Sequence, residues 1–393
     1  MTYTNKTLLA CFTSLLLLNG CGGGGSDTSP AIVTPPIPPP VTPPTSAENL
    51  TTAFGNYLTI LSNEHIIPRY TALATSAQAM QTASTTFCAI VAPQQSDLAT
   101  VQDAWASLNS AWQGIQWVKV GEVLQDNNLF RVQFWPDTNN AVNRGVSNLL
   151  IEPNTVTVAD VARQNVGGQG IPALEFLVYP DNQSDSLTTA MDRVKRCEAL
   201  TAIVQNVTEI TTTIQNDWSA SGNNYADSLI NGTGDFTSVK DSVEELVTNW
   251  LEHLENVKDE KILFPLGGQA PGVLDITEHF RSDVSLDSIE TNLLTFKALY
   301  TNGDQTGLDN ILRDTVLQPE IANQMLNALD AAIADVTDLQ QNFDSYAAVL
   351  NDTQGRAQLA AIVEDIRSIR DILSADFIQA LDINIGFNSN DGD

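Results

Sequence analysis

The sequence predicts an all-α protein with two helical-bundle domains, placed after a signal segment and a disordered Pro/Gly linker. Apolar residues recur at steps of three and four along most of the chain from Ala47 onward, and sustained strand alternation is absent. The stretch from Ala47 to the C-terminus is also longer than the ~250–300 residues that one hydrophobic core usually serves. These observations together favour two bundles of antiparallel helices.

Residues 1–20 have the pattern of a bacterial lipoprotein signal peptide. Lys6 precedes an apolar stretch from Leu8 to Leu18, about half of the ~20 residues that a membrane-spanning helix needs. The following Asn19-Gly20-Cys21 resembles a lipobox, in which the signal is removed and Cys21 carries the lipid. A secretory signal with a chance cysteine is the alternative. Because Gly22 rather than Asp follows the cysteine, we expect the lipid anchor to lie in the outer membrane, on its periplasmic face.

Residues 21–46 form the tether. From Gly22 to Ser46 the chain has eight of its 17 prolines and four consecutive glycines, with few bulky apolar residues, so this stretch cannot fold by itself. The folded part is then divided by the polar, turn-rich run from Pro180 to Ser186. We expect an N-terminal bundle at 47–185, a C-terminal bundle at 186–386 and a polar tail at 387–393.

The apolar spacing predicts the helices in order. An early helix is expected near 57–70, and Pro68 kinks or ends it. A second helix has apolar positions from Leu98 to Ile115. Further helices are expected over 200–214, 243–257, 326–346 and 359–373. A long entry helix precedes a tryptophan-bearing helix in each half, at 97–124 and at 239–263, which suggests a duplication. The regions 126–169 and 265–286 are expected to be irregular, with a short extended piece at 155–158.

The four cysteines divide into two pairs. Cys11 leaves with the signal and Cys21 is acylated, so Cys88 and Cys197 remain in the folded part of an exported protein. We expect a disulfide between them; two free buried thiols are the alternative. Such a bridge would close a loop of about a hundred residues and stabilise the fold by ~4 to 5 kcal/mol in the chain-entropy model.

The charge balance is strongly acidic, with 18 basic and 47 acidic residues and a formal net charge of −29. Nucleic acid and anionic lipid surfaces are therefore poor partners, and contact with the membrane is expected through the lipid anchor only. Most of this acidity is typical of a solvated surface.

Familiar catalytic motifs are absent from the sequence. It contains no Gly-x-Ser-x-Gly, no phosphate-binding loop, no dinucleotide fingerprint and no His-Glu-x-x-His. The three histidines, His65, His253 and His279, are isolated from one another and read as surface or structural residues rather than ligands.

The segment Gly167-Gly168-Gln169-Gly170-Ile171-Pro172-Ala173-Leu174-Glu175 is the main candidate site. Its glycines allow close backbone approach, Pro172 suits a first helical turn, and Glu175 is expected within that turn, near the positive end of the helix dipole. An ordinary glycine loop with Glu175 as a helix cap is the alternative.

Three segments in order resemble the imelysin-like family, also called the insulin-cleaving membrane protease family. Gly170, Pro172 and Glu175 occupy the positions of the family's Gly-x-His-x-x-Glu motif. The run from Arg131 through Trp135 to Asp137 is similar to a tryptophan-proline-aspartate segment, and the run from Glu278 through Arg281 and Ser282 is similar to a Glu-x-Trp-Arg-Ser segment, with Phe280 for Trp.

This resemblance implies two bundles related by duplication, a site between them near the Glu175 motif, and an association with bacterial iron uptake. The family's name also implies a peptidase, but Pro172 stands where the motif has histidine, and proline has no ring donor or acceptor to hold a metal.

The residues that the resemblance brings forward, Glu175, Gly170, Pro172, Arg131, Trp135, Asp137, Arg281 and Ser282, include hard oxygen ligands and two guanidinium groups. They indicate binding of iron, a metal complex or a small ligand; a buried salt-bridge network between domains is the alternative for the same residues. Two further functions stay open, an interaction scaffold for an envelope transport component and a metallopeptidase.

Overall fold

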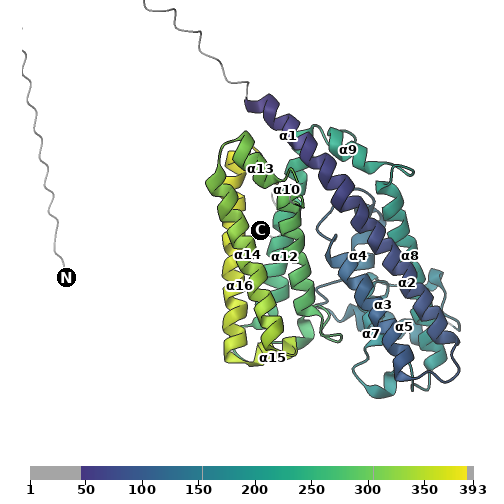
Figure 1. Cartoon of the computed structure of the whole chain (residues 1–393). Coiled ribbons are helices and arrows are strands. Elements are labelled where there is room, and N and C mark those ends of the chain that lie inside the picture. The colour runs from purple at the N-terminus through teal and green to yellow at the C-terminus, as the bar shows by residue number, and fades with distance from the viewer. Residues whose placement is uncertain (1–45, 153, 304, 387–393) are drawn as a thin grey trace, which may run out of the picture. The chain divides into compact units, whose positions relative to one another are not determined.

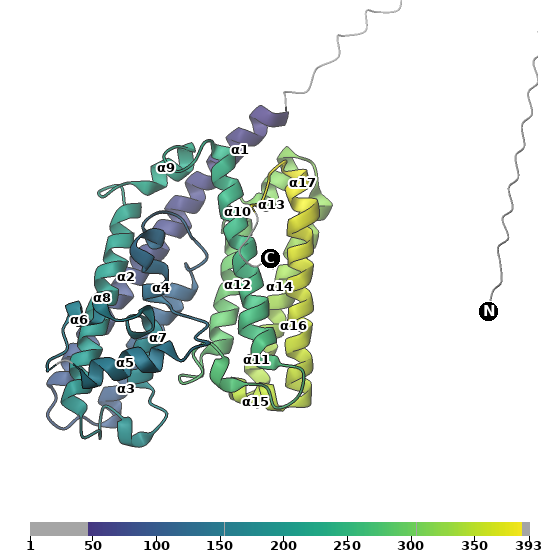
Figure 2. The same ribbon diagram turned by 180° about the vertical axis from the view of Figure 1, so that it is seen from behind.

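The computed structural model describes residues 46–152, 154–303 and 305–386. Every regular element in these ranges is helical, so the predicted all-α fold is confirmed for them. The long helices gather in two groups that lie side by side (Figures 1 and 2). No helix in the described ranges is long and apolar enough to cross a membrane. The predicted signal peptide, the acylated Cys21, the tether and the polar tail lie outside the described residues.

The first group of helices is built around one long N-terminal rod. α1 (Ser46–Ile60) continues through a π-helical segment, η1 (Leu61–Ile66), into α2 (Ile67–Ala89). The helix does not end at Pro68: the proline lies in the first turn of α2, directly after the wider π-helical segment η1, so the predicted interruption takes the form of a change of helix type. α3 (Gln95–Gln113) and α8 (Arg193–Trp218) pack on α2.

The predicted helix with apolar positions from Leu98 to Ile115 corresponds to α3. Trp105 and Trp112, seven residues apart, are both fully buried on its core-facing side, as the period of three and four requires. The helix ends at Gln113 rather than continuing to Leu124, because the chain turns at Gly114 and enters a 3-10 segment, η2 (Gly121–Asn127).

The region 126–169, predicted to be irregular, contains three short helices. These are α4 (Asn128–Val132), α5 (Ala141–Ile151) and α6 (Val158–Arg163), followed by the 3-10 segment η3 (Val166–Gly168) and by α7 (Ile171–Val178). Instead of the short extended piece expected at 155–158, Thr157 has an extended backbone and is the N-cap of α6. Its hydroxyl accepts a hydrogen bond from the Asp160 amide. Helices this short have too few apolar repeats for periodicity to reveal them.

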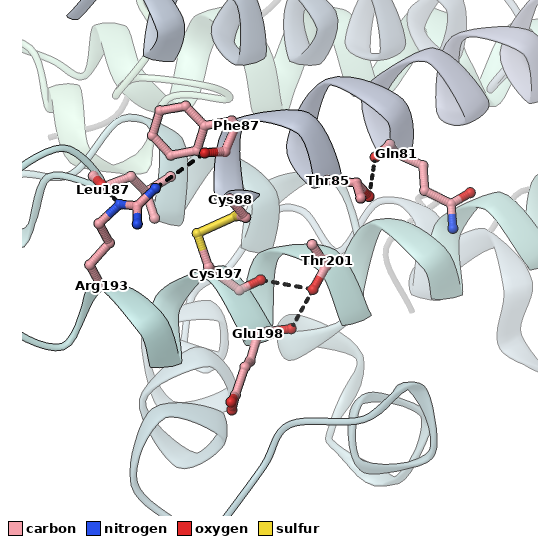
Figure 3. Close-up of a disulfide and its surroundings, with 9 residues drawn as sticks. All are labelled: Gln81, Thr85, Phe87, Cys88, Leu187, Arg193, Cys197, Glu198 and Thr201. Atoms are coloured by element: carbon pink, nitrogen blue, oxygen red, sulfur yellow. Dashed lines mark hydrogen bonds between the residues drawn. A yellow bond between two sulfur atoms is a disulfide. The ribbon is translucent and has the colours of Figure 1, made fainter. Parts of the chain in front are cut away.

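The Cys88–Cys197 disulfide is present, as predicted. It joins the C-terminal end of α2 to the first turns of α8 across a sequence separation of 109 residues, with a Cα–Cα distance of 5.6 Å (Figure 3). The adjacent Arg193 donates to the Phe87 and Leu187 carbonyls and covers the end of α2. The bridge therefore fixes a helix pair that packing already holds together.

The second group of helices surrounds Trp250. α10 (Val239–Asn256) runs through the π-helical segment η5 (Val257–Leu263) into α11 (Phe264–Leu266), and α12 (Ser285–Thr301), α14 (Pro319–Asn342) and α16 (Thr353–Ile372) complete the bundle. The ring of Trp250 contacts Phe296, Tyr300 and Phe377. Shorter elements link these helices: η4 (Gln183–Asp185), α9 (Tyr225–Asn231), η6 (Leu274–Ile276), α13 (Leu308–Asn310), η7 (Ile311–Thr315), α15 (Tyr346–Asn351), η8 (Leu373–Phe377) and α17 (Ile378–Ala380).

Polar contacts connect the two groups. Tyr57 of α1 donates to the Leu299 carbonyl, Asn302 donates back to the Tyr57 carbonyl, and Asn109 of α3 donates to Ser288 of α12. The described residues from 46 to 386 belong to one compact unit. α8 follows the predicted boundary at Ser186 but packs against α2; the division into domains at that position stays a prediction.

Candidate functional site

The glycine loop before α7 is shaped by close contact with its neighbours. A Cβ on Gly170 would lie 2.2 Å from the Val132 carbonyl oxygen, and a Cβ on Gly167 would lie 2.6 Å from the Ala141 backbone. Pro172 sits in the first turn of α7, as predicted from its fixed φ. The glycines thus let the backbone of the loop lie directly against α4 and α5, which sets the position of the helix that carries Glu175.

Glu175 is buried, with 3% of its surface exposed. It is the fifth residue of α7, so it lies beyond the first helical turn, and the expectation that it sits in that turn, or caps the helix, is wrong. The reason is that α7 already begins at Ile171, one residue before Pro172, which makes Glu175 the fifth helical residue and places it just past the first turn. Its carboxylate instead faces a loop from the second half of the chain.

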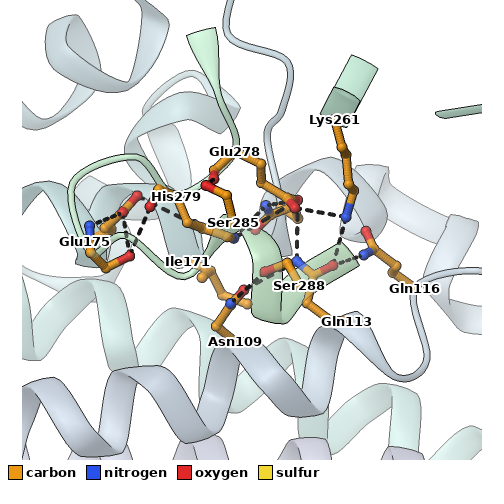
Figure 4. A network of polar contacts seen from close by, with 12 residues as sticks. Asn109, Gln113, Gln116, Ile171, Glu175, Lys261, Glu278, His279, Ser285 and Ser288 are labelled. Atoms are coloured by element: carbon orange, nitrogen blue, oxygen red, sulfur yellow. Dashed lines mark hydrogen bonds and ion pairs between the residues drawn. The ribbon is translucent and has the colours of Figure 1, made fainter. Parts of the chain in front are cut away.

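That loop runs from Thr277 to Ser285 and supplies the partners of Glu175. Ser282 donates its amide at 2.9 Å and its hydroxyl at 2.7 Å to Glu175 Oε1, and His279 Nδ1 lies 3.3 Å from Oε2 (Figure 4). His279 has a φ of 57° and 3% exposure. A non-glycine residue in the left-handed region is uncommon, and such residues concentrate at functional sites.

The hydrogen bonds define the charge state of Glu175. Burial by itself would raise the pKa of Glu175, but the hydrogen bonds from His279 and Ser282 outweigh it and hold the pKa below its usual range. The pattern assigns a proton to His279 Nδ1, since that atom faces a carboxylate, and leaves Nε2 to accept from the Gln133 amide at 3.2 Å.

A buried ion pair adjoins this group. Lys261, from the π-helical segment η5, lies 2.7 Å from Glu278 Oε2, and its ammonium also donates to Gln113 and Asn292 at 2.8 Å. Burial lowers the pKa of Lys261, while Lys261 overcomes the effect of burial on Glu278 and lowers the pKa of that carboxyl. Gln133 donates to Glu278 Oε1 at 3.0 Å as well as to His279, so it connects the Lys261–Glu278 ion pair with the histidine that contacts Glu175.

A pocket of about 530 Å³ opens beside Glu175 and His279. This volume lies within the ~300–1,000 Å³ typical of small-molecule sites. Its lining combines aromatic and charged side chains from both halves of the chain: Phe134, Trp135, Asp137, Pro172, Asp181, Phe264, Asp275, Phe280 and Arg281.

The structure gathers six of the predicted residues at this pocket. Glu175, Pro172, Trp135, Asp137 and Arg281 line it, and Ser282 holds Glu175. Asp137 also accepts from the amides of Ala141 and Val142 and so caps α5. Arg281 pairs with Asp181 at 3.1 Å and lies over the ring of Phe280 at 4.4 Å.

The two other predicted residues, Gly170 and Arg131, help to position the glycine loop and are not among the residues that line the pocket. Gly170 contacts the backbone of α4. Arg131 donates to Gln169, Asn128 and Asn206 and braces the loop against α8.

His279, Gln133, Lys261 and Glu278 form part of this network and were not proposed as site residues from the sequence. His279 was interpreted as a surface or structural residue because it is isolated in sequence from other histidines. One sequence feature could have pointed to His279 as a site residue. It directly follows Glu278 and occupies the variable position x of the segment similar to Glu-x-Trp-Arg-Ser. In the Gly-x-His-x-x-Glu motif, Pro172 occupies the histidine position and Glu175 the glutamate position. The packing of the second half of the chain brings His279 to the carboxylate of Glu175.

The residues at Glu175 do not fit a bare metal ion. Oε1 already accepts two hydrogen bonds from Ser282, and Oε2 faces the protonated nitrogen of His279. Among the described residues, no group of three or more histidines, cysteines, aspartates and glutamates is arranged to hold a metal.

The fold and site define a class of helical proteins in which a buried carboxylate–histidine pair adjoins a pocket lined by residues of both groups of helices. The family model for imelysin matches residues 66–373, and the chain belongs to the imelysin family. The predicted resemblance is thereby confirmed.

Two solved structures share the fold. An imelysin-like protein from Psychrobacter arcticum 273-4 is 20% identical, with a TM-score of 0.70 over 86% of this chain and 98% of that one. A structure named as an iron-regulated protein A precursor, from Parabacteroides distasonis ATCC 8503, is 16% identical, with a TM-score of 0.67 over 83% of this chain and 95% of that one. A search of curated proteins found no match.

Proposed function

We propose that this protein is a lipid-anchored envelope protein that binds a small ligand or a metal complex in support of bacterial iron uptake. The observation that carries the proposal is the buried Glu175–His279–Ser282 group at the wall of the 530 Å³ pocket. Burying an ionised carboxylate is costly unless it is hydrogen-bonded, and such arrangements concentrate at functional sites.

Arg281 is the group best placed to recognise an anionic part of the ligand. Its guanidinium lies over the rings of Phe176 and Phe280, at 5.1 and 4.4 Å from their centroids. Its carboxylate partner, Asp181, is largely exposed, with 53% of the side chain accessible. A ligand carboxylate can take the place of Asp181 at the largely buried Arg281 guanidinium, because the displaced Asp181 side chain already lies at the surface and is hydrated there.

A metal would enter this pocket as a complex that carries most of its own ligands, because both oxygens of Glu175 already have partners. Iron is the metal favoured by the imelysin resemblance and by the description of one structural neighbour as iron-regulated. The predicted lipobox and proline-rich tether support placement at the outer membrane, where such a protein would serve an envelope transport component.

The test is a calorimetric titration of the purified full chain with ferric citrate, ferrous iron and zinc. We expect near-stoichiometric binding of ferric citrate and at least a tenfold weaker affinity after Arg281→Gln and after Glu175→Gln, which keeps the size of the side chain. Glu320→Ala, at an exposed glutamate, is the matched control and should bind as the parent does.

Circular dichroism and a thermal melt establish that each variant is folded. Equal binding by the parent and by both site variants would remove Glu175 and Arg281 from the site. Absence of binding by the folded parent to all three probes would overturn the iron proposal; crosslinking in the envelope would then test the alternative of a docking role.

A further inference from the structure

A second pocket, of about 250 Å³, is lined by residues of both groups of helices. Leu129 and Phe130 come from α4, Trp135 follows that helix, and Glu260 and Lys261 come from the π-helical segment η5. The volume is slightly below the ~300 Å³ lower bound of drug-sized sites, so this pocket takes a smaller molecule than the one beside Glu175 does.

The charged side chains of this lining leave one carboxylate without a counter-charge. Lys119 pairs with Glu252 at 2.9 Å, and Lys261 pairs with Glu278 at 2.7 Å, so both lysines are already balanced. Glu260, the remaining charged residue of the lining, forms no ion pair with the described residues. The lining therefore has an unmatched negative charge, and an anionic occupant would find no free cation.

The surroundings of Glu260 make a bound cation favourable. Its side chain is half-buried, and burial, followed by the charge of Asp259, raises the pKa of this carboxyl. A carboxylate that is partly removed from water and lies near a like charge is stabilised by a cation brought next to it. π-helical segments such as η5 also occur frequently at functional sites.

A bare metal ion does not fit this pocket, because hard cations such as Ca²⁺ take six to eight oxygen ligands and Glu260 is the one carboxylate of the lining without an ion-pair partner among the described residues. The neighbouring surface is apolar instead. Phe130 is 49% exposed, and Leu129 and Trp135 are half-buried. Aromatic faces attract organic cations, and apolar walls favour a cation that carries an apolar body.

We infer that this pocket binds a small organic monocation, an amine with an apolar ring or chain. The ammonium group pairs with Glu260, and the apolar body lies against Phe130 and Leu129. The excess of 47 acidic over 18 basic residues raises the concentration of cations near the whole protein and so favours their capture. This site does not depend on the function proposed for the pocket beside Glu175.

Four probes test the inference. Benzylammonium, benzamide and benzoate are similar in size and differ in charge, and methylammonium has the charge without the apolar body. The full chain, labelled with ¹⁵N at its six tryptophans, reports binding through the indole N–H signal of Trp135, which is assigned by its loss in Trp135→Phe. Benzylammonium should shift this signal with an affinity at least tenfold higher than that of the other three probes.

Substitutions then locate the bound probe. Glu260→Gln, which keeps the size of the side chain, should weaken benzylammonium binding at least fivefold, and Phe130→Leu should weaken it two- to fivefold. Asp259→Asn is the matched control, because it removes an equal charge from the adjacent residue, which does not line the pocket. It should bind within twofold of the parent, and a thermal melt establishes that each variant is folded.

Trp135 lines both pockets, so Asp275→Asn serves as a second control: Asp275 lines the pocket beside Glu175 and not this one. Benzylammonium binding should persist in this variant and in Glu175→Gln. The inference is overturned if benzylammonium leaves the Trp135 signal unmoved, if it binds no better than benzamide, or if Glu260→Gln binds it as the parent does.

Discussion

Ser282 and Glu175 are 107 residues apart in the chain, yet Ser282 donates both its amide and its hydroxyl to one carboxylate oxygen of Glu175. Both donors come from a loop of the second half, and the acceptor comes from a helix of the first. This contact holds the loop that carries His279 and Arg281 against α7. Residues of both halves of the chain therefore line the same pocket.

Ser282→Ala should destabilise the protein by about 1.5–3 kcal/mol at pH 7, because it removes a hydrogen bond to a buried charged group. The pKa of Glu175 is lowered on folding, so this contribution is present above its unfolded value of 4.5 and is lost as pH falls through the folded value. Urea denaturation at pH 7 and pH 3.5 measures both effects. Ser96→Ala, at an exposed serine, is the control and should change little.

Lys261→Met should cost about 3–5 kcal/mol, since it leaves the Glu278 carboxylate buried without its counter-charge. Adding Glu278→Gln to Lys261→Met should recover part of that loss, because the second change removes the unpaired charge. Urea denaturation of the two single variants and the double variant provides the measurement. Additive losses in the double variant would contradict a direct pairing of the two side chains.

Replacing both Cys88 and Cys197 by alanine should lower the free energy of unfolding by about 4–5 kcal/mol, because the bridge closes a loop of 109 residues in the unfolded chain. Guanidinium titrations with and without a reducing agent measure this loss. The reductant should destabilise the parent by a similar amount and leave the double variant unchanged; an effect on the double variant would point to a different target.

Asp365→Asn should stabilise the protein above pH 6. Burial, followed by the neighbouring Asp335, raises the pKa of Asp365 to about 6, so ionisation at neutral pH disfavours the folded state. That penalty diminishes as pH falls from 6 towards the unfolded value of 3.8, where the carboxyl is protonated in both states. Thermal melts at pH 7.5 and pH 4 should show a gain only at the higher pH, whereas Asp344→Asn should show none.

Much of the fold was predictable from local patterns. The helix with apolar positions from Leu98 to Ile115 and those over 326–346 and 359–373 correspond to α3, α14 and α16, because long amphipathic repeats define the buried face of a helix. Short elements such as α5, and the unpredicted α12, show the limit: α5 is too short for a clear repeat, and polar residues such as Asn292 occupy buried positions of α12.

The site was predictable only where a motif marked it. Glu175 was predicted from the glycine loop and helix start that precede it, and again through the family resemblance; Ser282 was predicted through the resemblance alone, and the two residues are in contact in the structure. His279 was interpreted as a surface or structural residue, and Lys261 was not proposed as a site residue, since no local spacing connects either of them to Glu175.

The sequence by itself determined the all-α class, the long helices, the disulfide partners and the family. Only the tertiary structure decided that His279 meets Glu175, that Gln133 joins Glu175's partner to the Lys261–Glu278 pair, and that residues of both halves of the chain line the pocket beside Glu175. The physical reason is that periodicity specifies which face of a helix is buried. What that face is buried against depends on how helices distant in sequence pack together.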